Sequence, residues 1–268
     1  QFFEGVRILE ELVNQALKDP AVPEAYLWLG QGYEATGLHD KAIAAYRTLF
    51  IRFPLSPEAE QAAFRAETIP PIGRTLSSVL SPREHLERAD QLAEAGDCDR
   101  AMQAVRQRSA SGQSEDLAAW AARRLGFCAY RLRRYREAIA SLDRFRYVQG
   151  ADDLSAEALY FLGLALQRDG RGGEAEGVLR QLIAREPPTV WNSKALVALG
   201  LSYESRQQTE RSIGAYRELA TRFPTSDRAD ELSWRIGWLY YAQRLFGTAA
   251  QEFGKTAERF PQSLFASN

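Results

Sequence analysis

The sequence predicts an all-α protein, an α/α superhelix built from stacked helix pairs, and two periodic signals support this fold class. Small residues recur every 37 residues at Ala89, Gly126, Gly163, Gly200 and Gly237. Prolines keep the same interval near the ends of helical runs, at Pro187, Pro224 and Pro261. A fixed period of this length is typical of stacked supersecondary units in which each unit packs on its neighbours.

The elements follow in order from a first amphipathic helix over residues 1–18. The first full helix pair, residues 26–54, has an apolar and small-residue pattern that resembles the tetratricopeptide repeat: Tyr26, Leu29, Gly30, Tyr33, Ala42, Tyr46, Leu49 and Pro54. The same pattern returns in the segments 159–187, 196–224 and 236–261, and more weakly in 85–108 and 122–150. The small residue lets two helices approach closely, large residues form the apolar stripe of each helix, and the closing proline ends the second helix.

One interruption divides the array. The interval from Gly30 to Ala89 is longer than one period, and it contains Ile69-Pro70-Pro71-Ile72-Gly73 followed by Ser81-Pro82. We interpret the extra residues as a short helix followed by an extended connector. The predicted organisation is an N-terminal helical repeat segment at 1–68, a proline-rich connector at 69–82, and a repeat array at 83–268. Because the period predicts another helix starting near Ser263, we expect the array to be truncated at its C-terminal end.

Composition excludes several classes of protein. The net charge is −1 and the isoelectric point is near 6.3, so no global field attracts nucleic acid. No apolar run is long enough for a transmembrane segment, and no signal peptide occurs in these residues. Cys98 and Cys128 cannot form a disulfide framework for a chain of 268 residues, and they suit either a reducing compartment or an exported protein with few cysteines.

No pattern in the sequence indicates catalysis, a metal or a cofactor. His39 and His85 are predicted on polar edges of helices or turns, without further ligands at metal spacing. The run Gly170-Arg171-Gly172-Gly173 follows a helix and lacks the Lys-Ser/Thr ending of a phosphate loop, so we interpret it as a turn between helices. We expect no catalytic residue, no metal site and no cofactor.

The first helix of each pair lines the concave face of such a stack, which makes that face the predicted binding groove. Counting from each repeat glycine, the predicted groove residues are Trp120, Arg123, Phe127, Tyr130, Arg131, Tyr160, Arg168, Trp234, Trp238 and Tyr241, with Leu164, Gln167, Lys194, Val197, Leu201, Glu204 and Glu231 between them. Aromatic and arginine side chains suit a peptide or a sugar-containing polymer. Packing of these aromatics against neighbouring helices is the alternative.

Residues 120–147 add eight arginines against only two carboxylates, Glu137 and Asp143. The excess favours a groove for an anionic polymer. A solvated helix face is the alternative.

Three segments resemble the N-terminal superhelical region of bacterial soluble lytic murein transglycosylases. They are residues 45–60 (Ala-Tyr-Arg-Thr-Leu-Phe-Ile-Arg-Phe-Pro-Leu-Ser-Pro-Glu-Ala-Glu), 83–96 (Arg-Glu-His-Leu-Glu-Arg-Ala-Asp-Gln-Leu-Ala-Glu-Ala-Gly) and 229–241 (Ala-Asp-Glu-Leu-Ser-Trp-Arg-Ile-Gly-Trp-Leu-Tyr-Tyr). The resemblance implies a non-catalytic periplasmic scaffold that binds peptidoglycan glycan strands, with a C-terminal catalytic module elsewhere in the parent chain. Glu204-Ser205 is the sole candidate for that module's catalytic pair. No Gly-Leu-Met-Gln stretch follows it, so no catalytic residue is carried over.

Two other functions remain open from the sequence. One is a periplasmic adaptor of the outer-membrane assembly lipoprotein type, whose repeats share the Phe-Pro-x-Ser joints. The other is a cytoplasmic tetratricopeptide adaptor that binds peptide tails of partner proteins. The proline-rich connector and the Ser-Pro-Glu-Ala-Glu joint at residues 56–60 favour the transglycosylase scaffold over the periplasmic adaptor, because a compact adaptor is expected to keep the period unbroken. With the scaffold we expect a periplasmic location.

Overall fold

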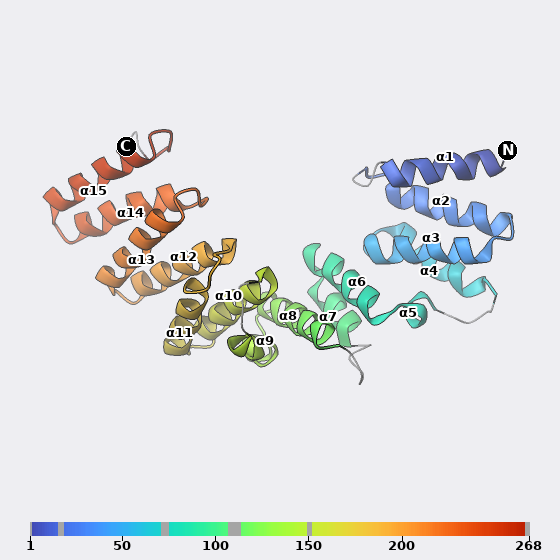
Figure 1. The fold of residues 1–268 in the computed structure, drawn as a ribbon, viewed down its shortest axis with the longest axis horizontal. Helices are drawn as coiled ribbons and strands as arrows, with labels where there is room; N and C mark the ends of the chain where they lie inside the picture. Colours follow the sequence, from blue (N-terminus) through green and yellow to red (C-terminus); the bar gives the residue numbers. More distant parts are fainter. Residues whose placement is uncertain (1, 16–18, 71–74, 107–113, 149–151, 266–268) are drawn as a thin grey trace. The chain divides into compact units, whose positions relative to one another are not determined.

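The structure, a computed structural model, describes residues 2–15, 19–70, 75–106, 114–148 and 152–265, and these residues form helices joined by turns (Figure 1). The chain divides into two compact units, residues 1–133 (unit 1) and residues 134–268 (unit 2). The prediction of an all-α solenoid of helix pairs is confirmed. The three segments predicted from the sequence, 1–68, 69–82 and 83–268, stay a prediction.

In unit 1, α2 pairs with α3 and α6 pairs with α7, while α1 packs on α2 and α4 packs on α3. The helices of this unit are α1 (Phe2–Gln15), α2 (Val22–Ala35), α3 (His39–Arg52), α4 (Pro57–Thr68), α5 (Leu76–Val79), α6 (Pro82–Glu94), α7 (Cys98–Arg106) and α8 (Glu115–Arg131). The predicted extended connector therefore contains one helical turn, α5. Thr75 caps this turn by accepting a hydrogen bond from the Ser78 amide, and Leu76 is buried.

In unit 2, consecutive helices pair as α10 with α11, α12 with α13, and α14 with α15. The elements of this unit are α9 (Tyr135–Leu142), the 3-10 helix η1 (Asp143–Tyr147), α10 (Asp153–Arg168), α11 (Gly172–Ile183), α12 (Val190–Ser205), α13 (Thr209–Arg222), α14 (Ala229–Ala242) and α15 (Phe246–Arg259). Each first helix of a pair also packs on the second helix of the pair before it, as α12 does on α11.

The period appears in the backbone as well as in the sequence. The turn between the two helices of each pair contains one residue with positive φ, and these residues are Gly37, Gly96, Arg133, Gly170, Gln207 and Arg244. Each lies seven residues after the small residue of its repeat. This left-handed residue is the C-terminal cap of the first helix, as in the bond from the Gln208 amide to the Tyr203 carbonyl. Glycine adopts this conformation without strain, whereas other residues do so at a cost.

The repeat glycine is needed because a ring lies directly over it. A Cβ atom at Gly30 would overlap the ring of Tyr46, and one at Gly200 would overlap the ring of Tyr216. The second helix thus contributes a large side chain to this contact. The buried alanine of that helix, such as Ala42, packs nearby but is not the group nearest to the glycine. The close approach of the two helices that the sequence predicts is present. The side chain that lies against the glycine is a large one such as Tyr46, and not the predicted alanine.

The Phe-Pro joints have one shared geometry. The second helix ends two residues before the proline at Pro54, Pro224 and Pro261. In each joint the serine amide after the proline donates to the phenylalanine carbonyl before it, at 3.0 Å. The predicted stop signal is confirmed at these joints, because proline has no N–H to continue the helix.

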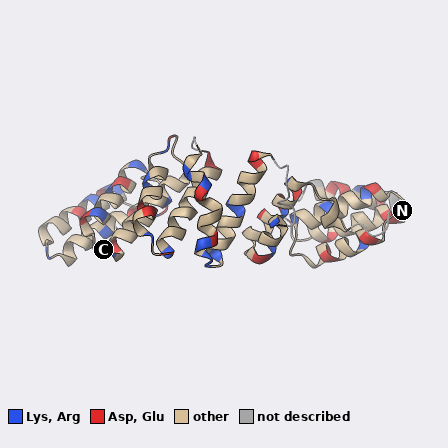
Figure 2. Cartoon of the chain, turned by 90° about the horizontal axis from the view of Figure 1, so that it is seen from below, with Lys and Arg blue, Asp and Glu red and all other residues tan. Residues whose placement is uncertain are grey.

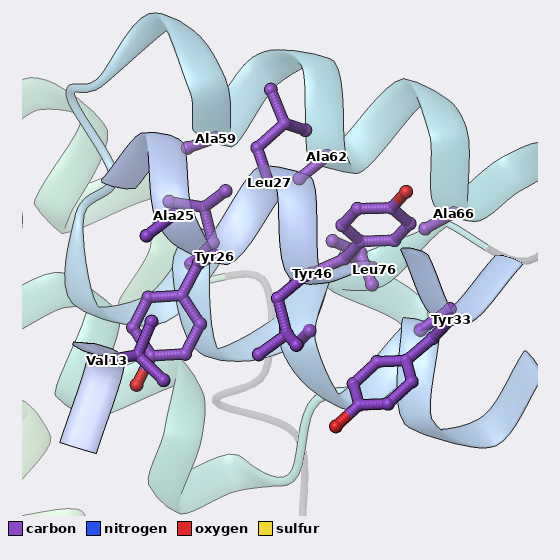
Figure 3. Close-up of a cluster of buried hydrophobic side chains, with 14 of the residues drawn as sticks. Val13, Ala25, Tyr26, Leu27, Tyr33, Tyr46, Ala59, Ala62, Ala66 and Leu76 are labelled. Carbon is purple, nitrogen blue, oxygen red and sulfur yellow. The ribbon is translucent and has the colours of Figure 1, made fainter. Parts of the chain in front are cut away.

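The core of unit 1 is continuous from α1 to α5. Figure 3 shows Val13, Tyr26, Tyr33, Tyr46 and Leu76 in this cluster, with the small residues of α4 along one side of it. Alanines on α4 (Ala59, Ala62 and Ala66) let this helix lie close to its neighbours. This close packing of alanines explains why α4 stays packed on its neighbours although α5, the helix that follows it, has only four residues.

Three local expectations need revision or lie outside the described residues. His85 is not on a polar edge: it is 3% exposed on α6, because its side chain faces the apolar side of that helix. Cys98 and Cys128 are free, buried thiols on α7 and α8. The helix expected near Ser263 does not start within residues 263–265, and residues 266–268 lie outside the described part.

Candidate functional site

Unit 2 contains a pocket of about 370 Å³ between the first helices of two neighbouring pairs. Its residues come from α10, from α12 and from the turn before α14: Tyr160, Phe161, Leu164, Trp191, Lys194, Val197, Ser226, Asp227 and Arg228. Four of them (Tyr160, Leu164, Lys194 and Val197) are predicted groove residues. A concave site with apolar walls and a few polar groups is the usual form of a binding pocket.

The repeat positions these residues. Tyr160 and Leu164 lie one helical turn apart on α10, so both side chains reach the same face. Trp191, Lys194 and Val197 follow at intervals of three residues on α12 and also share a face. The start of α12 is held by a capping box between Thr189 and Asn192.

Asn192 also donates from Nδ2 to the carbonyls of Leu182 and Arg185 at 2.9 and 3.2 Å. These bonds join the start of α12 to the end of α11. The pocket is therefore built on anchored helices.

Three aromatic rings form one wall of the pocket. The ring centroid of Trp191 lies 5.4 Å from that of Tyr160 and 5.9 Å from that of Phe161. The Lys194 ammonium lies 4.3 Å from the centroid of the Trp191 ring, within the range of a cation–π contact. The indole Nε1 of Trp191 is buried and has no hydrogen-bond partner among the described residues. Because this atom has no accessible surface, the indole ring contributes its face and not its N–H to the pocket.

The charged side chains of the unit 2 pocket differ in whether an ion pair neutralises them. Arg228 forms a bidentate ion pair with Glu231, with N–O distances of 2.8 and 2.9 Å. This pair lowers the pKa of the Glu231 carboxyl through the hydrogen bonds from Arg228. Asp227 is exposed to solvent. Lys194 makes no ion pair with any carboxylate of the described residues, so its charge is the one inside the pocket that is open to a ligand.

The predicted residues of α14 form a second aromatic surface on unit 2. Trp234 packs on Trp238 with centroids 5.6 Å apart, and Trp238 packs on Tyr241 at 5.2 Å. Tyr241 continues to Phe246 of α15 at 5.2 Å. Trp238 is 44% exposed and Tyr241 is 50% exposed. The opposite side of Trp234 packs on Phe253 and Phe265, so this ring is partly a packing residue.

Two of the predicted residues of α8, Trp120 and Arg123, contact one carboxylate of unit 1. Asp90 of α6 accepts a hydrogen bond from Trp120 Nε1 at 2.8 Å and pairs with the guanidinium groups of Arg123 and Arg124. Arg123 is only 5% exposed. Phe127 lies between the cations of Arg124 and Arg131, at 5.4 and 5.7 Å.

Because of these contacts, Trp120 and Arg123 help to pack α8 on α6. Tyr130 is half-buried and Arg131 is exposed. Contact of a ligand with any of the five predicted residues of α8 stays a prediction. These residues are Trp120, Arg123, Phe127, Tyr130 and Arg131.

The arginine excess of residues 120–147 is partly compensated by carboxylates. Ion pairs join Arg123 and Arg124 to Asp90, Arg136 to Asp169, and Arg146 to Asp143. Arg168, another predicted groove residue, is exposed in the last turn of α10. Figure 2 shows both signs of charge along the helices of each unit.

Glu204, the one glutamate considered for catalysis, has a structural environment. Its carboxylate accepts two bonds from Arg235 at 2.5 and 2.8 Å and one from the Tyr216 hydroxyl at 3.0 Å. The bonds from Arg235 lower the pKa of Glu204. A general acid needs the opposite shift. Glu204 therefore acts as a tether between α12, α13 and α14.

Sequence reasoning missed five residues of the unit 2 pocket: Phe161, Trp191, Ser226, Asp227 and Arg228. Trp191 and Arg228 both lie nine residues before the glycine of their repeats, one turn beyond the earliest position counted as part of the groove. Extending the count by one turn would have found both. Phe161 lies two residues before Gly163, at a position expected to be internal.

Within the described residues, no group of three or more His, Cys, Asp or Glu side chains could hold a metal ion. Across the same part of the chain, no helix is long and apolar enough to cross a membrane.

Comparison with known proteins places this architecture in a family. A family model described as Tetratricopeptide repeat matches residues 4–59 and 129–189, and a second model of the same description matches residues 194–226. No curated protein sequence matches the chain.

Solved structures agree in fold. MamA is 25% identical, with a TM-score of 0.52 over 65% of this chain and 95% of its own. The C-terminal part of a TPR repeat-containing protein from Cytophaga hutchinsonii is 12% identical, with a TM-score of 0.55 over 99% of this chain and 93% of its own. BtubC from P. vanneervenii is 14% identical, with a TM-score of 0.53 over 83% and 88%.

Proposed function

We propose that this tetratricopeptide-repeat protein is a protein-interaction scaffold whose unit 2 pocket binds a peptide segment that pairs an apolar side chain with a carboxylate. The matched repeats at residues 4–59, 129–189 and 194–226 support the scaffold, because such arrays present concave surfaces to partner chains. The ligand chemistry is argued from the pocket itself.

The observation that carries the proposal is the Lys194 ammonium, which lies over the Trp191 ring beside the apolar wall and forms no ion pair with a carboxylate of the described residues. A carboxylate of the ligand neutralises this charge and accepts a hydrogen bond from it. The apolar wall formed by Tyr160, Leu164 and Val197 provides the surface for an aliphatic or aromatic side chain. Asp227 at the rim disfavours ligands with several carboxylates in a row.

Two substitutions test the two parts of the site. Trp191→Ala removes the ring of the apolar wall, and Lys194→Ala removes the ammonium together with its aliphatic stem. Each is expected to weaken binding of a labelled peptide with alternating Leu and Asp residues by roughly tenfold, because a buried aromatic contact and a hydrogen bond to a charged group each contribute about 1.5–3 kcal/mol. Lys255→Ala is the matched control, since Lys255 lies on the exposed face of α15 in the same unit.

Fluorescence anisotropy measures the affinities. Equal affinity of the parent protein and of both pocket variants would exclude the pocket as the binding site. An equal loss in the Lys255→Ala control would show that charge on the whole surface, and not the pocket, governs binding.

The second candidate function is the scaffold of a periplasmic lytic transglycosylase that holds peptidoglycan glycan strands. The three resembling segments and the exposed aromatic surface of Trp238, Tyr241 and Phe246 favour it, because sugars stack on exposed rings. The catalytic module belongs to this candidate alone, whereas the periplasmic location is shared with the adaptor of the outer-membrane assembly lipoprotein type. Titration with muropeptides tests it: a change in tryptophan fluorescence that Trp238→Ala abolishes supports glycan binding, and no change removes this candidate.

A further inference from the structure

Unit 1 contains a separate groove, between α1 and α2, which lie side by side (Figure 1). Its volume is about 550 Å³. Val6 and Leu9 of α1 form one side, and Trp28, Gly32 and Ala35 of α2 form the other. None of these residues belongs to the predicted groove or to the unit 2 pocket.

A glycine lines each side of the groove, Gly5 on α1 and Gly32 on α2. A Cβ atom added at Gly5 would meet nothing within 4 Å, so a ligand has room at this position. At Gly32 a Cβ atom would lie 2.8 Å from Cγ2 of Val6, so any larger residue there would push α1 away. Glycine inside a helix reduces helix stability. Two glycines inside helices line this one cavity. They indicate that open space is favoured here over helix stability.

The groove also exposes large apolar side chains. Trp28 is 55% exposed at its edge. Ile8 and Leu12, on the adjacent face of α1, are 55% and 38% exposed and extend the apolar surface. A half-exposed tryptophan beside a cavity is the type of residue that contributes most to binding when a partner covers it.

The charge around the groove has one dominant sign. Helices α1 and α2 carry five glutamates (Glu4, Glu10, Glu11, Glu24 and Glu34) and a single cation, Arg7, which pairs with both Glu4 and Glu11. Glu24 lies one helical turn before Trp28, on the same face of α2, and is exposed. No ion pair joins it to a cation of the described residues.

The other charges near the groove are committed to internal contacts. Glu34 is held by Arg65 at 3.2 Å and accepts a bond from the Tyr46 hydroxyl. Glu10 accepts a bond from the Tyr33 hydroxyl. The nearest cation from α3 is Lys41, whose ammonium lies over the Tyr33 ring at 5.3 Å.

We propose that the α1–α2 groove is a docking site for an amphipathic segment of a partner protein that inserts one apolar face and carries Lys or Arg beside it. The apolar side chains of the segment cover Trp28 and fill the space above Gly5. Its cations lie against Glu24 and the carboxylates at the edge of α1. Charge complementarity selects this partner over an acidic one, because like charges close together weaken binding.

The proposal rests on unit 1 alone, so its outcome is independent of the proposed function of the unit 2 pocket. The probe is a short fluorescein-labelled helical peptide with Leu and Phe on one face and Lys on the other. A second peptide has Glu in place of each Lys. Binding of both to the complete chain is followed by fluorescence anisotropy at low and high salt.

Three variants remove different parts of the site. Trp28→Ala removes the apolar anchor and is expected to weaken the Lys peptide at least about tenfold. Glu24→Lys reverses the local charge and is expected to weaken it several-fold, with a smaller salt dependence than in the parent protein. Gly5→Leu fills the cavity and favours the helix, so it should block binding without loss of fold.

The controls are matched to these changes. Phe64→Ala removes another exposed aromatic ring of unit 1, on α4. Glu60→Lys reverses an exposed carboxylate in the first turn of α4, as Glu24 is in the first turn of α2, so the two have the same effect on the helix dipole. Both controls should keep the parent affinity.

Several outcomes would overturn the proposal. These are equal binding of the Lys and Glu peptides, unchanged affinity in both Trp28→Ala and Gly5→Leu, or a loss in the controls equal to that in the site variants. A parent protein that dimerises in sedimentation and becomes monomeric with Trp28→Ala would assign the groove to a second copy of the chain instead.

Discussion

The two units carry apolar pockets that share one origin and differ in charge. Trp28 in unit 1 and Phe161 in unit 2 both lie two residues before the glycine of their repeat. The two helices that line the first pocket carry five glutamates and one arginine, whereas the second pocket contains the Lys194 ammonium. The comparison teaches that repeat register decides where an apolar surface forms, and that polar residues outside the repeat pattern decide what it binds.

The largest expected effect is on the framework that both pockets share. Gly200→Ala places a methyl group against the ring of Tyr216 and should destabilise the chain by about 1–3 kcal/mol. Gly30→Ala should act similarly in unit 1, against Tyr46. Gly214→Ala is the control: it lies on α13 with open space around it, so it should raise stability by up to about 1 kcal/mol.

Chemical denaturation measures these changes in stability. Hydrogen exchange shows where they act, and Gly200→Ala should increase exchange chiefly in α12 and α13. If Gly200→Ala and Gly214→Ala had the same sign, close packing at the repeat glycine would not be what holds the helix pair together.

The next effect concerns ligand charge. Lys194→Glu should weaken the Leu/Asp peptide by more than tenfold and leave the Lys peptide unchanged, whereas Glu24→Lys should weaken the Lys peptide several-fold and leave the Leu/Asp peptide unchanged. A like charge close to the ligand adds repulsion to the lost attraction. Anisotropy titrations of both peptides against both variants measure this. A variant that alters both peptides equally would show that overall charge, and not the pocket, selects the ligand.

A smaller effect separates two kinds of turn that occur in both units. The left-handed turn residue is glycine at Gly37, Gly96 and Gly170, but it is Arg133, Gln207 or Arg244 in the other turns. Gln207→Gly should raise the free energy of unfolding by up to about 1 kcal/mol, because glycine removes the cost of positive φ. Gly37→Gln should lower it by a similar amount. Thermal unfolding measures both, and a loss of stability in Gln207→Gly would contradict the assigned turn geometry.

The smallest effect is on pH dependence. Burial alone would raise the pKa of Glu84, but Arg47 and Ser81 hold this pKa at about 2. A carboxyl whose pKa is lower in the folded state than its usual value of 4.5 stabilises the fold above pH 4.5, and this contribution is lost as the pH falls toward 2. Glu204 of unit 2 shifts in the same direction through Arg235.

Glu84→Gln and Glu204→Gln should therefore each be slightly less stable than the parent at pH 7, with the difference vanishing in acid. Urea denaturation at a series of pH values measures this, and a difference that grew below pH 4.5 would contradict the assignment for that residue.

Much of the fold could be predicted from the sequence because the pattern is local. The glycine interval, the prolines and the apolar stripes concern residues within one helix pair, and each local signal agrees with the next. The candidate site was predicted only in part. Tyr160 and Lys194 followed from the register, whereas the burial of Trp191 Nε1 depends on how α10 and α12 pack.

Arg123 illustrates the limit. Its position in the repeat predicts a groove residue, but Asp90 of another helix pairs with it and holds it inside unit 1. No pattern within α8 predicts this ion pair, because Asp90 and Arg123 are far apart in sequence. The same holds for His85, whose burial follows from the packing of α6 and not from its own neighbours.

The sequence by itself determined the helix pairs, their period, their turns and the ends of their helices, because backbone conformation and helix capping depend on nearby residues. Only the tertiary structure decided which aromatic rings pack and which remain exposed. It also decided which charges are compensated, and where the cavities beside Trp28 and Trp191 lie. Those properties depend on contacts between different helices, and the packing of neighbouring repeats, not their period, sets such contacts.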